Sequence, residues 1–244
     1  MSRFGKLAAS LGGVLAPQTC PACGERGEAD VLCDACRDSV ATPGEPACGV
    51  CRLPGRVPGE EPRCEACLGG RGFRSACAAA LFDEPLKSWV ARLKYRGEST
   101  LAPALGHLAR GAFERFCDVA AYDLVVPVPL SPGRYRERGF NQSFLLASAI
   151  ATPHGLPVVP MLRRIRETDP QVGLESGARE DNVAGAFAVD PEHGEPQGLT
   201  VLLVDDVLTT GATVDACARV LMGAGAAFDL ANVLLRTFAF KLYR

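Results

Sequence analysis

Short hydrophobic runs alternate with helical repeats along the chain beyond residue 70. Apolar runs at residues 76–82, 124–129, 158–162, 186–189, 200–206 and 230–235 predict buried strands. Between them, apolar residues recur with helical spacing over residues 85–95, 101–116, 141–151 and 212–223. Strands that alternate with helices predict an α/β fold with a mainly parallel sheet.

Residues 200–213 form the most informative corner of this pattern, because an apolar strand, two acids, a hydroxyl-rich turn and a helix start follow one another. We expect Asp205 and Asp206 to face outward at the strand end, where they suit sugar hydroxyls or a bound Mg²⁺. Free backbone N–H groups at the helix start provide an anion site, and Gly211 allows close approach. The pattern indicates a sugar-phosphate site. A strand–turn–helix corner with capping threonines has similar features, and a Walker B strand also ends in acids but needs a phosphate-loop partner that the chain lacks.

The same corner resembles the 5-phosphoribosyl 1-pyrophosphate (PRPP) loop of the type I phosphoribosyltransferases. The resemblance implies that the two acids hold the ribose 2′ and 3′ hydroxyls and that residues 207–213 wrap the 5′-phosphate. The implied PRPP-binding residues are Asp205, Asp206, Val207, Leu208, Thr209, Thr210, Gly211, Ala212 and Thr213.

A basic, glycine-bounded segment follows the strand at 124–129, and we expect it to be a loop. The carboxyl ends of parallel strands lie on one side of a sheet, so this loop should lie near the two acids. Its backbone amides and arginines can hold a pyrophosphate with Mg²⁺, although a solvated basic loop would have the same composition. The predicted pyrophosphate loop consists of Val128, Pro129, Leu130, Arg134, Arg136 and Arg138.

The chain has eleven cysteines, and eight of them form four Cys-x-x-Cys pairs. This spacing is typical of tetrahedral zinc sites with four sulfur ligands, which are closed and structural. Disulfides, redox pairs or an iron–sulfur cluster are alternatives. Sequential pairing gives two zinc sites, and interleaved pairing stays open. The eight predicted ligands are Cys20, Cys23, Cys33, Cys36, Cys48, Cys51, Cys64 and Cys67.

Composition places the chain among globular proteins of the cytoplasm. It has 244 residues, 48% hydrophobic residues and a net charge of −2, so bulk charge does not favour nucleic-acid binding. Paired cysteines in an odd total favour a reducing compartment, and no apolar run reaches the length of a membrane helix. We predict an amphipathic lead-in helix at 1–19, which we prefer to a signal peptide, a double zinc ribbon at 20–70 and a phosphoribosyltransferase-like domain at 71–244.

Several further motifs make the chain resemble the ComF competence-protein family. They are LKYRG at 93–97, VPVPL at 126–130, RGFNQ at 138–142 and TDPQ at 168–171, in addition to the acid-containing corner. The resemblance implies a type I phosphoribosyltransferase fold behind a zinc ribbon. It also implies a role in DNA uptake during natural transformation, with single-stranded DNA and a helicase-like competence protein as partners. By the same resemblance, a flexible loop with Arg163, Arg164 and Gln171 closes over the pyrophosphate.

Two functions follow from these patterns. The first is phosphoribosyl transfer, in which a nucleophile displaces Mg-pyrophosphate from ribose; the pattern identifies neither a catalytic base nor the acceptor, and turnover stays open. The alternative is a non-catalytic module that senses a nucleotide or binds single-stranded DNA. In that case, arginines of the two loops face the phosphodiester backbone and Phe140 or Tyr135 stacks on bases.

Overall fold

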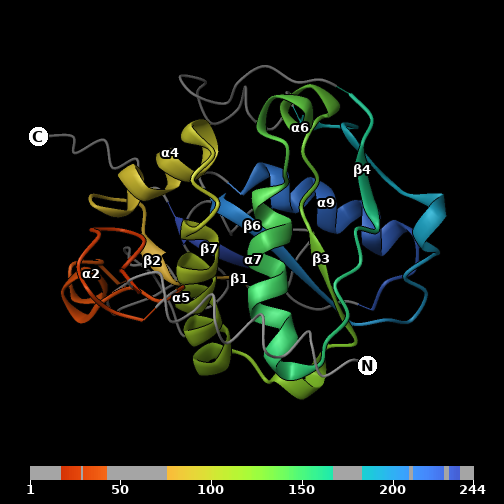
Figure 1. Cartoon of the computed structure of the whole chain (residues 1–244). Helices are drawn as coiled ribbons and strands as arrows, with labels where there is room; N and C mark the ends of the chain where they lie inside the picture. The colour runs from red at the N-terminus through yellow and green to blue at the C-terminus, as the bar shows by residue number, and fades with distance from the viewer. Residues whose placement is uncertain are drawn as a thin grey trace, which may run out of the picture.

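A small parallel sheet forms the centre of the computed structural model, which describes residues 18–28, 30–42, 76–166, 183–208, 211–227 and 231–236 (Figure 1). The sheet has five strands in the order β1-β7-β6-β3, and β2 also pairs with β7. Every pairing within it is parallel, which confirms the predicted fold class. Its strands are β1 (Ala76–Cys77), β2 (Ala80–Leu81), β3 (Leu124–Pro127), β6 (Val201–Leu208) and β7 (Ala231–Arg236).

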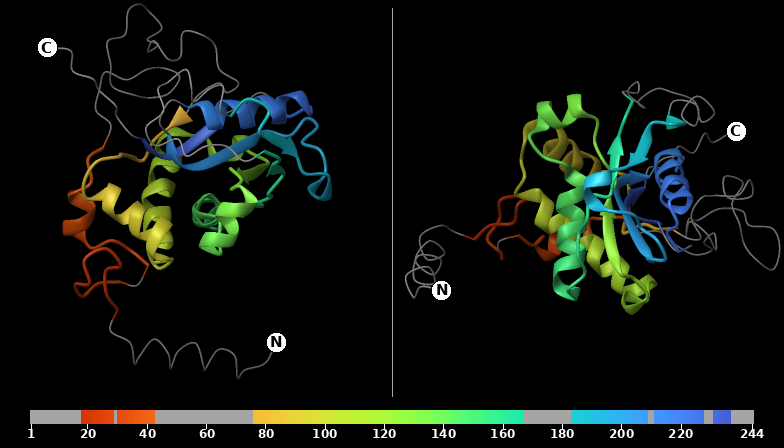
Figure 2. Two further views of the ribbon diagram at one scale, coloured as in Figure 1. Left: turned by 90° about the horizontal axis from the view of Figure 1, so that it is seen from above. Right: turned by 90° about the vertical axis from the view of Figure 1, so that its right-hand side faces the viewer.

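Helices cover both faces of this sheet (Figure 2). The helices are α2 (Asp34–Asp38), α4 (Leu86–Arg96), α5 (Leu101–Phe116), α6 (Pro132–Arg138), α7 (Gln142–Ala151) and α9 (Ala212–Gly223), with short 3₁₀ turns at Val119–Ala121, Thr152–His154 and Pro191–His193. Buried side chains of α4, α5 and α7 form one hydrophobic cluster, and those of α9 form a second. None of the helices among the described residues has the length and apolar character needed to cross a membrane.

Strand β6 takes part in both clusters because successive side chains of a strand point to opposite faces. Leu202 and Val204 join the cluster with α5 and α7, whereas Val201 and Leu203 join the cluster with α9. A strand that is apolar on both sides must lie inside a layered fold. The hydrophobic run before the two acids therefore fixes β6 at the centre of the molecule.

Two predicted elements are wrong in type or position. Residues 132–138 form helix α6 instead of a loop, since Ser131 caps its first turn by accepting a hydrogen bond from the backbone N–H of Arg134 at 3.4 Å, and Pro132 suits the first helical position. The strand expected at 158–162 lies at β4 (Leu162–Arg164), which pairs antiparallel with β5 (Phe187–Val189). Pro157 and Pro160 lack backbone N–H donors, so Val158 between them forms only an isolated bridge to Val125.

The N-terminal cysteine segment packs directly on the α/β part. Cys20, Leu32 and Val40 belong to the same buried cluster as α4 and α5. The backbone N–H of Leu81 in β2 also donates to the carbonyl of Ala41 at 2.8 Å. Residues 1–17 of the lead-in helix predicted at 1–19, and the boundary near residue 70, lie outside the described residues, and Thr19 forms an isolated bridge with Arg26.

Helices α5 and α7 approach closely at Gly106, and this contact generates a prediction. A methyl group added to Gly106 would overlap the Cβ of Ala149, whereas one added to Gly111 on the same helix meets nothing. We expect Gly106→Ala to destabilise the fold by about 1–3 kcal/mol through overpacking. Gly111→Ala should stabilise it by about 0.5–1 kcal/mol, because alanine favours helix. Denaturant unfolding measures both, and equal effects of the two substitutions would contradict the close packing.

Candidate functional site

Asp205 and Asp206 lie where strand β3 ends beside β6. The last paired residue of β3, Pro127, lies opposite Val204, so β6 continues through the acids with β7 as its one neighbour among the described strands. Their side chains are only 8% and 6% exposed. The prediction that both acids face outward is therefore wrong. The physical reason is that β6 extends to Leu208 instead of ending at the acids, and groups from α4 and α7 cover them.

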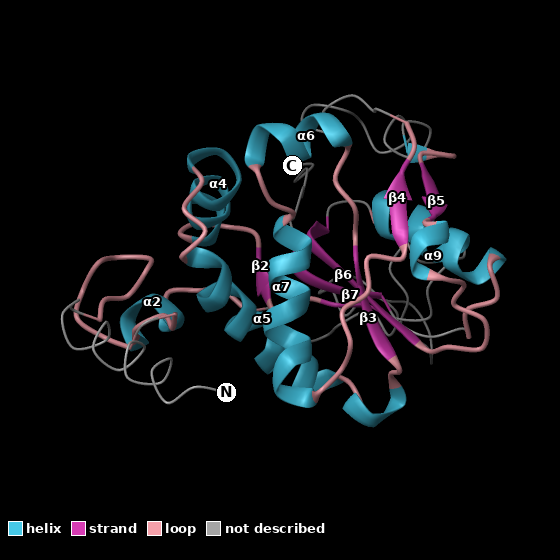
Figure 3. Ribbon diagram, turned by 45° about the vertical axis from the view of Figure 1, so that its right-hand side comes forward, coloured by secondary structure: helices cyan, strands magenta, loops and turns pink. Residues whose placement is uncertain are grey.

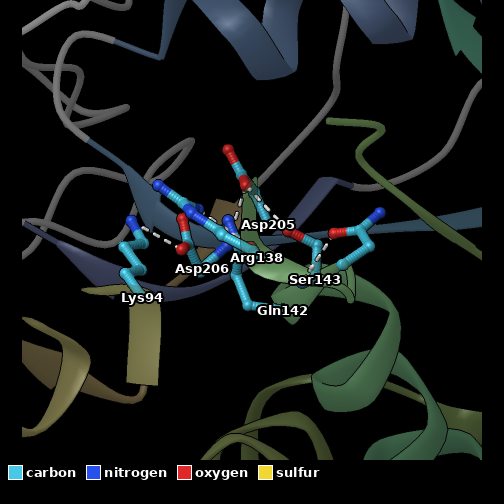
Figure 4. A network of polar contacts seen from close by, with 7 residues as sticks. Lys94, Arg138, Gln142, Ser143, Asp205 and Asp206 are labelled. Atoms are coloured by element: carbon cyan, nitrogen blue, oxygen red, sulfur yellow. Dashed lines mark hydrogen bonds and ion pairs between the residues drawn. The ribbon is translucent and has the colours of Figure 1, made fainter. Parts of the chain in front are cut away.

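The carboxylate of Asp205 is tied to the start of helix α7 (Figure 4). Its Oδ1 accepts hydrogen bonds from the hydroxyl of Ser143 at 3.2 Å and from the backbone N–H of Asp206 at 2.8 Å. Asn141 fixes this helix start, because its side chain accepts from the N–H of Ser143 and donates to the carbonyl of Val128, both at 3.0 Å. The end of β3, the start of α7 and the acid of β6 thus form one connected unit.

The carboxylate of Asp206 is paired with a lysine from helix α4. Lys94 Nζ lies 2.6 Å from Asp206 Oδ2, and the lysine side chain is 17% exposed. That oxygen has no hydrogen-bond partner among the described residues, so the contact is an ion pair without hydrogen-bond geometry. Lys94 therefore supplies positive charge to the acids and leaves acceptor capacity on Asp206.

Burial, and after it the charge of Asp206, raise the pKa of Asp205, which lies at about 7 in the folded protein. The N–H of Asp206, the ammonium of Lys94 and the hydroxyl of Ser143 act in the opposite direction. Perturbed pKa values of this kind are common at functional sites. This carboxyl group therefore changes its charge near neutral pH.

Arg138, at the end of α6, brings a second positive charge to the acids (Figure 4). Its guanidinium carbon lies 5.4 Å from the ring centre of Tyr95, and its Nη1 donates to Gln142 Oε1 at 3.1 Å. Its Nε is buried and has no hydrogen-bond partner among the described residues. Arg138 is thus held in orientation by an aromatic ring and an amide, while one donor stays available.

Some of the other predicted PRPP-binding residues lie near the acids, and others lie elsewhere in the molecule. Val207 and Leu208 belong to β6 instead of the turn, and Leu208 is buried among apolar residues. Gly211 has a φ of 84°, a left-handed value that favours glycine, and Ala212 and Thr213 begin α9. Thr209, Thr210 and Gln171 lie outside the described residues.

The residues of the predicted pyrophosphate loop and flexible loop also lie in different parts of the structure. Arg138 contacts Tyr95 and Gln142 beside the acids. Arg136 is exposed on α6, and Arg163 and Arg164 lie in the paired strand β4 instead of a loop. The remaining residues of the predicted pyrophosphate loop follow β3 or lie on α6, and they are Val128, Pro129, Leu130 and Arg134.

Sequence reasoning assigned no role to Lys94, Tyr95, Gln142 or Ser143. The first three stand in the LKYRG and RGFNQ motifs. A lone lysine on an amphipathic helix gives no sign of its partner, because that partner lies more than a hundred residues away in the chain. The two motifs were the only signal in the sequence that could have identified Lys94 and Gln142 as site residues.

Four of the predicted zinc ligands come together in the N-terminal segment. The sulfur atoms of Cys20, Cys23, Cys33 and Cys36 all lie within 4.8 Å of one another, and those of Cys23 and Cys33 are 3.7 Å apart. A tetrahedron with Zn–S bonds of about 2.3 Å has edges of about 3.8 Å, so the four thiolates fit a zinc ion. The backbone N–H of Cys33 also donates to the sulfur of Cys20 at 3.4 Å. This supports a structural zinc and confirms sequential pairing for the first set; the ligands of the second set lie outside the described residues.

Comparison with known families agrees with this arrangement. Residues 11–68 match the family model of the double zinc ribbon domain. The matched stretch includes all eight predicted ligands. The two-site cysteine segment inferred from spacing is thus a recognised domain type.

Curated relatives match the α/β part as well. The chain is 26% identical to competence protein ComFC of Bacillus subtilis over 63% of its own length and 60% of that protein, which is less than two thirds of the relative. It is 35% identical to DNA utilization protein YhgH of Salmonella typhi over 64% of its length and 69% of the relative. With YhgH of Escherichia coli, identity is 30% over 84% of this chain and 90% of the relative.

Solved structures give a more distant likeness. Adenine phosphoribosyltransferase from Saccharomyces cerevisiae aligns with a TM-score of 0.33 and 19% identity, over 57% of this chain and 67% of that chain. A likeness at this level carries no argument about the site, whose description depends on its own geometry.

The buried charge of Asp205 leads to a prediction about stability and pH. Its folded pKa of about 7 lies above its ordinary value of 3.8, so its contribution to stability is present at low pH and is lost as pH rises through about 7. Asp205→Asn cannot ionise. We expect its Tm to exceed that of the original protein by about 2–4 °C at pH 8, for each kcal/mol regained, with a smaller difference at pH 5, because the loss begins above pH 3.8.

Differential scanning fluorimetry at the two pH values measures this change. Glu137→Gln, which removes an exposed acid on α6, is the matched control and should leave Tm unchanged. A difference between Asp205→Asn and the original protein that is the same at pH 5 and pH 8 would show that Asp205 does not titrate in this range.

Proposed function

The chain belongs to the family of ComF competence proteins and YhgH DNA utilization proteins, and from this premise we propose that it binds a phosphorylated ribose at the carboxyl end of β6. The observation that supports the proposal best is the pair of adjacent carboxylates at that position, with Lys94 and Ser143 holding them. The ligand is PRPP or a related phosphoribosyl compound with Mg²⁺.

The chemistry of the ligand matches these groups. The vicinal 2′ and 3′ hydroxyls of ribose are two adjacent donors, and Asp205 and Asp206 are two adjacent acceptors. The start of α9 offers backbone N–H groups and a positive dipole to the 5′-phosphate, with Gly211 in the turn before it. Arg138 and Lys94 add positive charge for the pyrophosphate, and Mg²⁺ takes the oxygen ligands it prefers.

Burial of the acids sets a condition for binding. Because so little of either side chain is exposed, a ligand reaches them only when the long side chains beside them shift. Arg138 has a flexible stem and can move its charged head to phosphate oxygens, while Lys94 stays beside Asp206. Binding then pairs the guanidinium of Arg138 with the ligand and keeps the ion pair between Lys94 and Asp206.

Isothermal titration with PRPP and Mg²⁺ tests this proposal. We expect binding with a dissociation constant below about 1 mM, the upper end of the range usual for metabolites. The double substitution of Asp205→Asn and Asp206→Asn should weaken binding by at least about tenfold, since hydrogen bonds to charged groups contribute about 1.5–3 kcal/mol each. Pyrophosphate release, measured in the same samples, reports whether bound PRPP turns over.

Glu137→Gln serves again as the control and should bind as the original protein does. Circular dichroism and zinc content must be unchanged in the double variant. Absence of binding heat in the intact, zinc-loaded protein at millimolar PRPP would reject the ligand assignment.

A second function, binding of single-stranded DNA, is favoured by the surface of α6. This short helix presents Arg136 to solvent and Tyr135 with 53% of its surface exposed. Arginine with an exposed aromatic ring suits phosphodiester and base stacking. The relatives' names, which refer to competence and DNA utilization, are consistent with such a role.

Salt-dependent binding to a fluorescent oligonucleotide tests the DNA function. Arg136→Ala should reduce the slope of log affinity against log salt by about 0.7, the value for one phosphate contact on a single strand. PRPP affinity should stay unchanged. Arg37→Ala, at an exposed position of α2, which lies away from α6 in Figure 1, is the matched control. An equal effect of both substitutions would assign the binding to bulk charge instead of α6.

A further inference from the structure

Helix α4 has contacts with both the N-terminal cysteine segment and Asp206 of β6, and Figure 3 shows it near both α2 and the central sheet. Two of its residues, Arg92 and Lys94, are separated by one position. At 3.6 residues per turn they are therefore rotated by roughly 200° from each other. Their side chains leave α4 on opposite sides, one toward the cysteine segment and one toward Asp206.

Arg92 holds the turn that lies between two zinc ligands. Its Nη1 donates to the carbonyl of Ala22 at 2.7 Å and its Nη2 to the carbonyl of Pro21 at 3.0 Å. Its Nε donates to Glu98 Oε2 at 2.8 Å, which fixes the plane of the guanidinium. Pro21 and Ala22 are the two residues between Cys20 and Cys23. Both carbonyls stand in place for Arg92 only when this turn has its folded shape.

Apolar packing ties the same segment to the same helix. The zinc ligand Cys20 is only 1% exposed and belongs to the buried cluster that contains Trp89, Val90 and Leu93 of α4. Removal of the metal would let the turn open, since small segments of this kind fold with their zinc. Opening the turn removes both the guanidinium contacts and part of the apolar cover of α4.

On its other side, α4 carries the ammonium that compensates the buried acids. Lys94 is the cation that the described residues place in an ion pair with Asp206. Two adjacent buried carboxylates repel each other, and a cation beside them offsets this repulsion. The position of α4 therefore decides how the acids are charged and how well they accept hydrogen bonds from a ligand.

We propose that α4 couples zinc binding in the N-terminal segment to the acids of β6, so that bound zinc holds Lys94 at Asp206 and raises the affinity for the ligand. The effect on ligand affinity rests on the proposed phosphoribosyl function, whereas the effect on Lys94 does not. Coupling between two sites is reciprocal. A bound ligand therefore slows the loss of zinc to the same extent that zinc favours the ligand.

Chemical labelling of Lys94 tests the coupling without any ligand. N-hydroxysuccinimide acetate modifies exposed amines, and peptide mass spectrometry gives the rate at each lysine. We expect the rate at Lys94 to rise at least about fivefold in zinc-loaded Arg92→Ala, the lower end of typical coupling factors. Lys87, exposed on the same helix and paired only with Asp83 among the described residues, is the internal control and should not change. Arg96→Ala, at an exposed position of α4, is the matched variant and should leave Lys94 protected.

The ligand arm uses PRPP with Mg²⁺ in the same proteins. Arg92→Ala should weaken PRPP binding by about five- to tenfold, and saturating PRPP should slow zinc transfer to a chromophoric chelator in the original protein but not in this variant. If circular dichroism shows that Arg92→Ala does not fold, Glu98→Gln replaces it, because it weakens the ion pair that fixes the plane of the same guanidinium.

The outcomes separate the two proposals. An unchanged labelling rate at Lys94 in the zinc-loaded variant overturns the coupling, whatever PRPP does. A raised rate at Lys94, together with no PRPP binding to the original protein, supports the coupling and overturns the phosphoribosyl function. A raised rate together with weakened PRPP binding supports both.

Discussion

Two adjacent carboxylates buried in the second half of the central strand β6 are the constraint on which the rest of this structure depends. Like charges at neighbouring positions in a poorly hydrated place are unstable unless hydrogen bonds and a cation offset the repulsion. Here the cation comes from α4 through Lys94 and a hydroxyl comes from α7 through Ser143. The two helices must therefore keep their positions relative to β6, and their packing in one hydrophobic cluster provides this.

The same arrangement explains why this position of the sheet can hold two adjacent acids. Strand β6 passes between β3 and β7, and β3 ends at Pro127, just before the acids begin. Ending the neighbouring strand makes room for the capped start of α7, which Asn141 ties back to Val128. An apolar side chain could fill that room more stably. The presence of two buried acids there agrees with a role in binding, because perturbed pKa values are common at functional sites.

Local patterns were sufficient to predict most of the fold. The apolar repeat predicted α5 over residues 101–116, which is the range observed, and the Cys-x-x-Cys spacing predicted the four sulfur atoms that come together. Helix α6 was missed although Ser131 and Pro132 are helix-start residues, because its arginines and glycines suggested a loop. Burial of the acids and the role of Lys94 were beyond reach, since both depend on contacts between residues far apart in the chain.

Helix α4 contacts both the cysteine segment and the acids, so a zinc ion in that segment affects more than the residues around it. If the segment were a separate attachment, its zinc would stabilise only the residues around it. Cys20, however, shares a buried cluster with α4, and Arg92 donates to the carbonyls between the first two ligands. The folding free energy that zinc supplies is therefore shared with the helix that carries Lys94. A structural metal can in this way set the charge balance of a distant pair of carboxylates without contacting either of them.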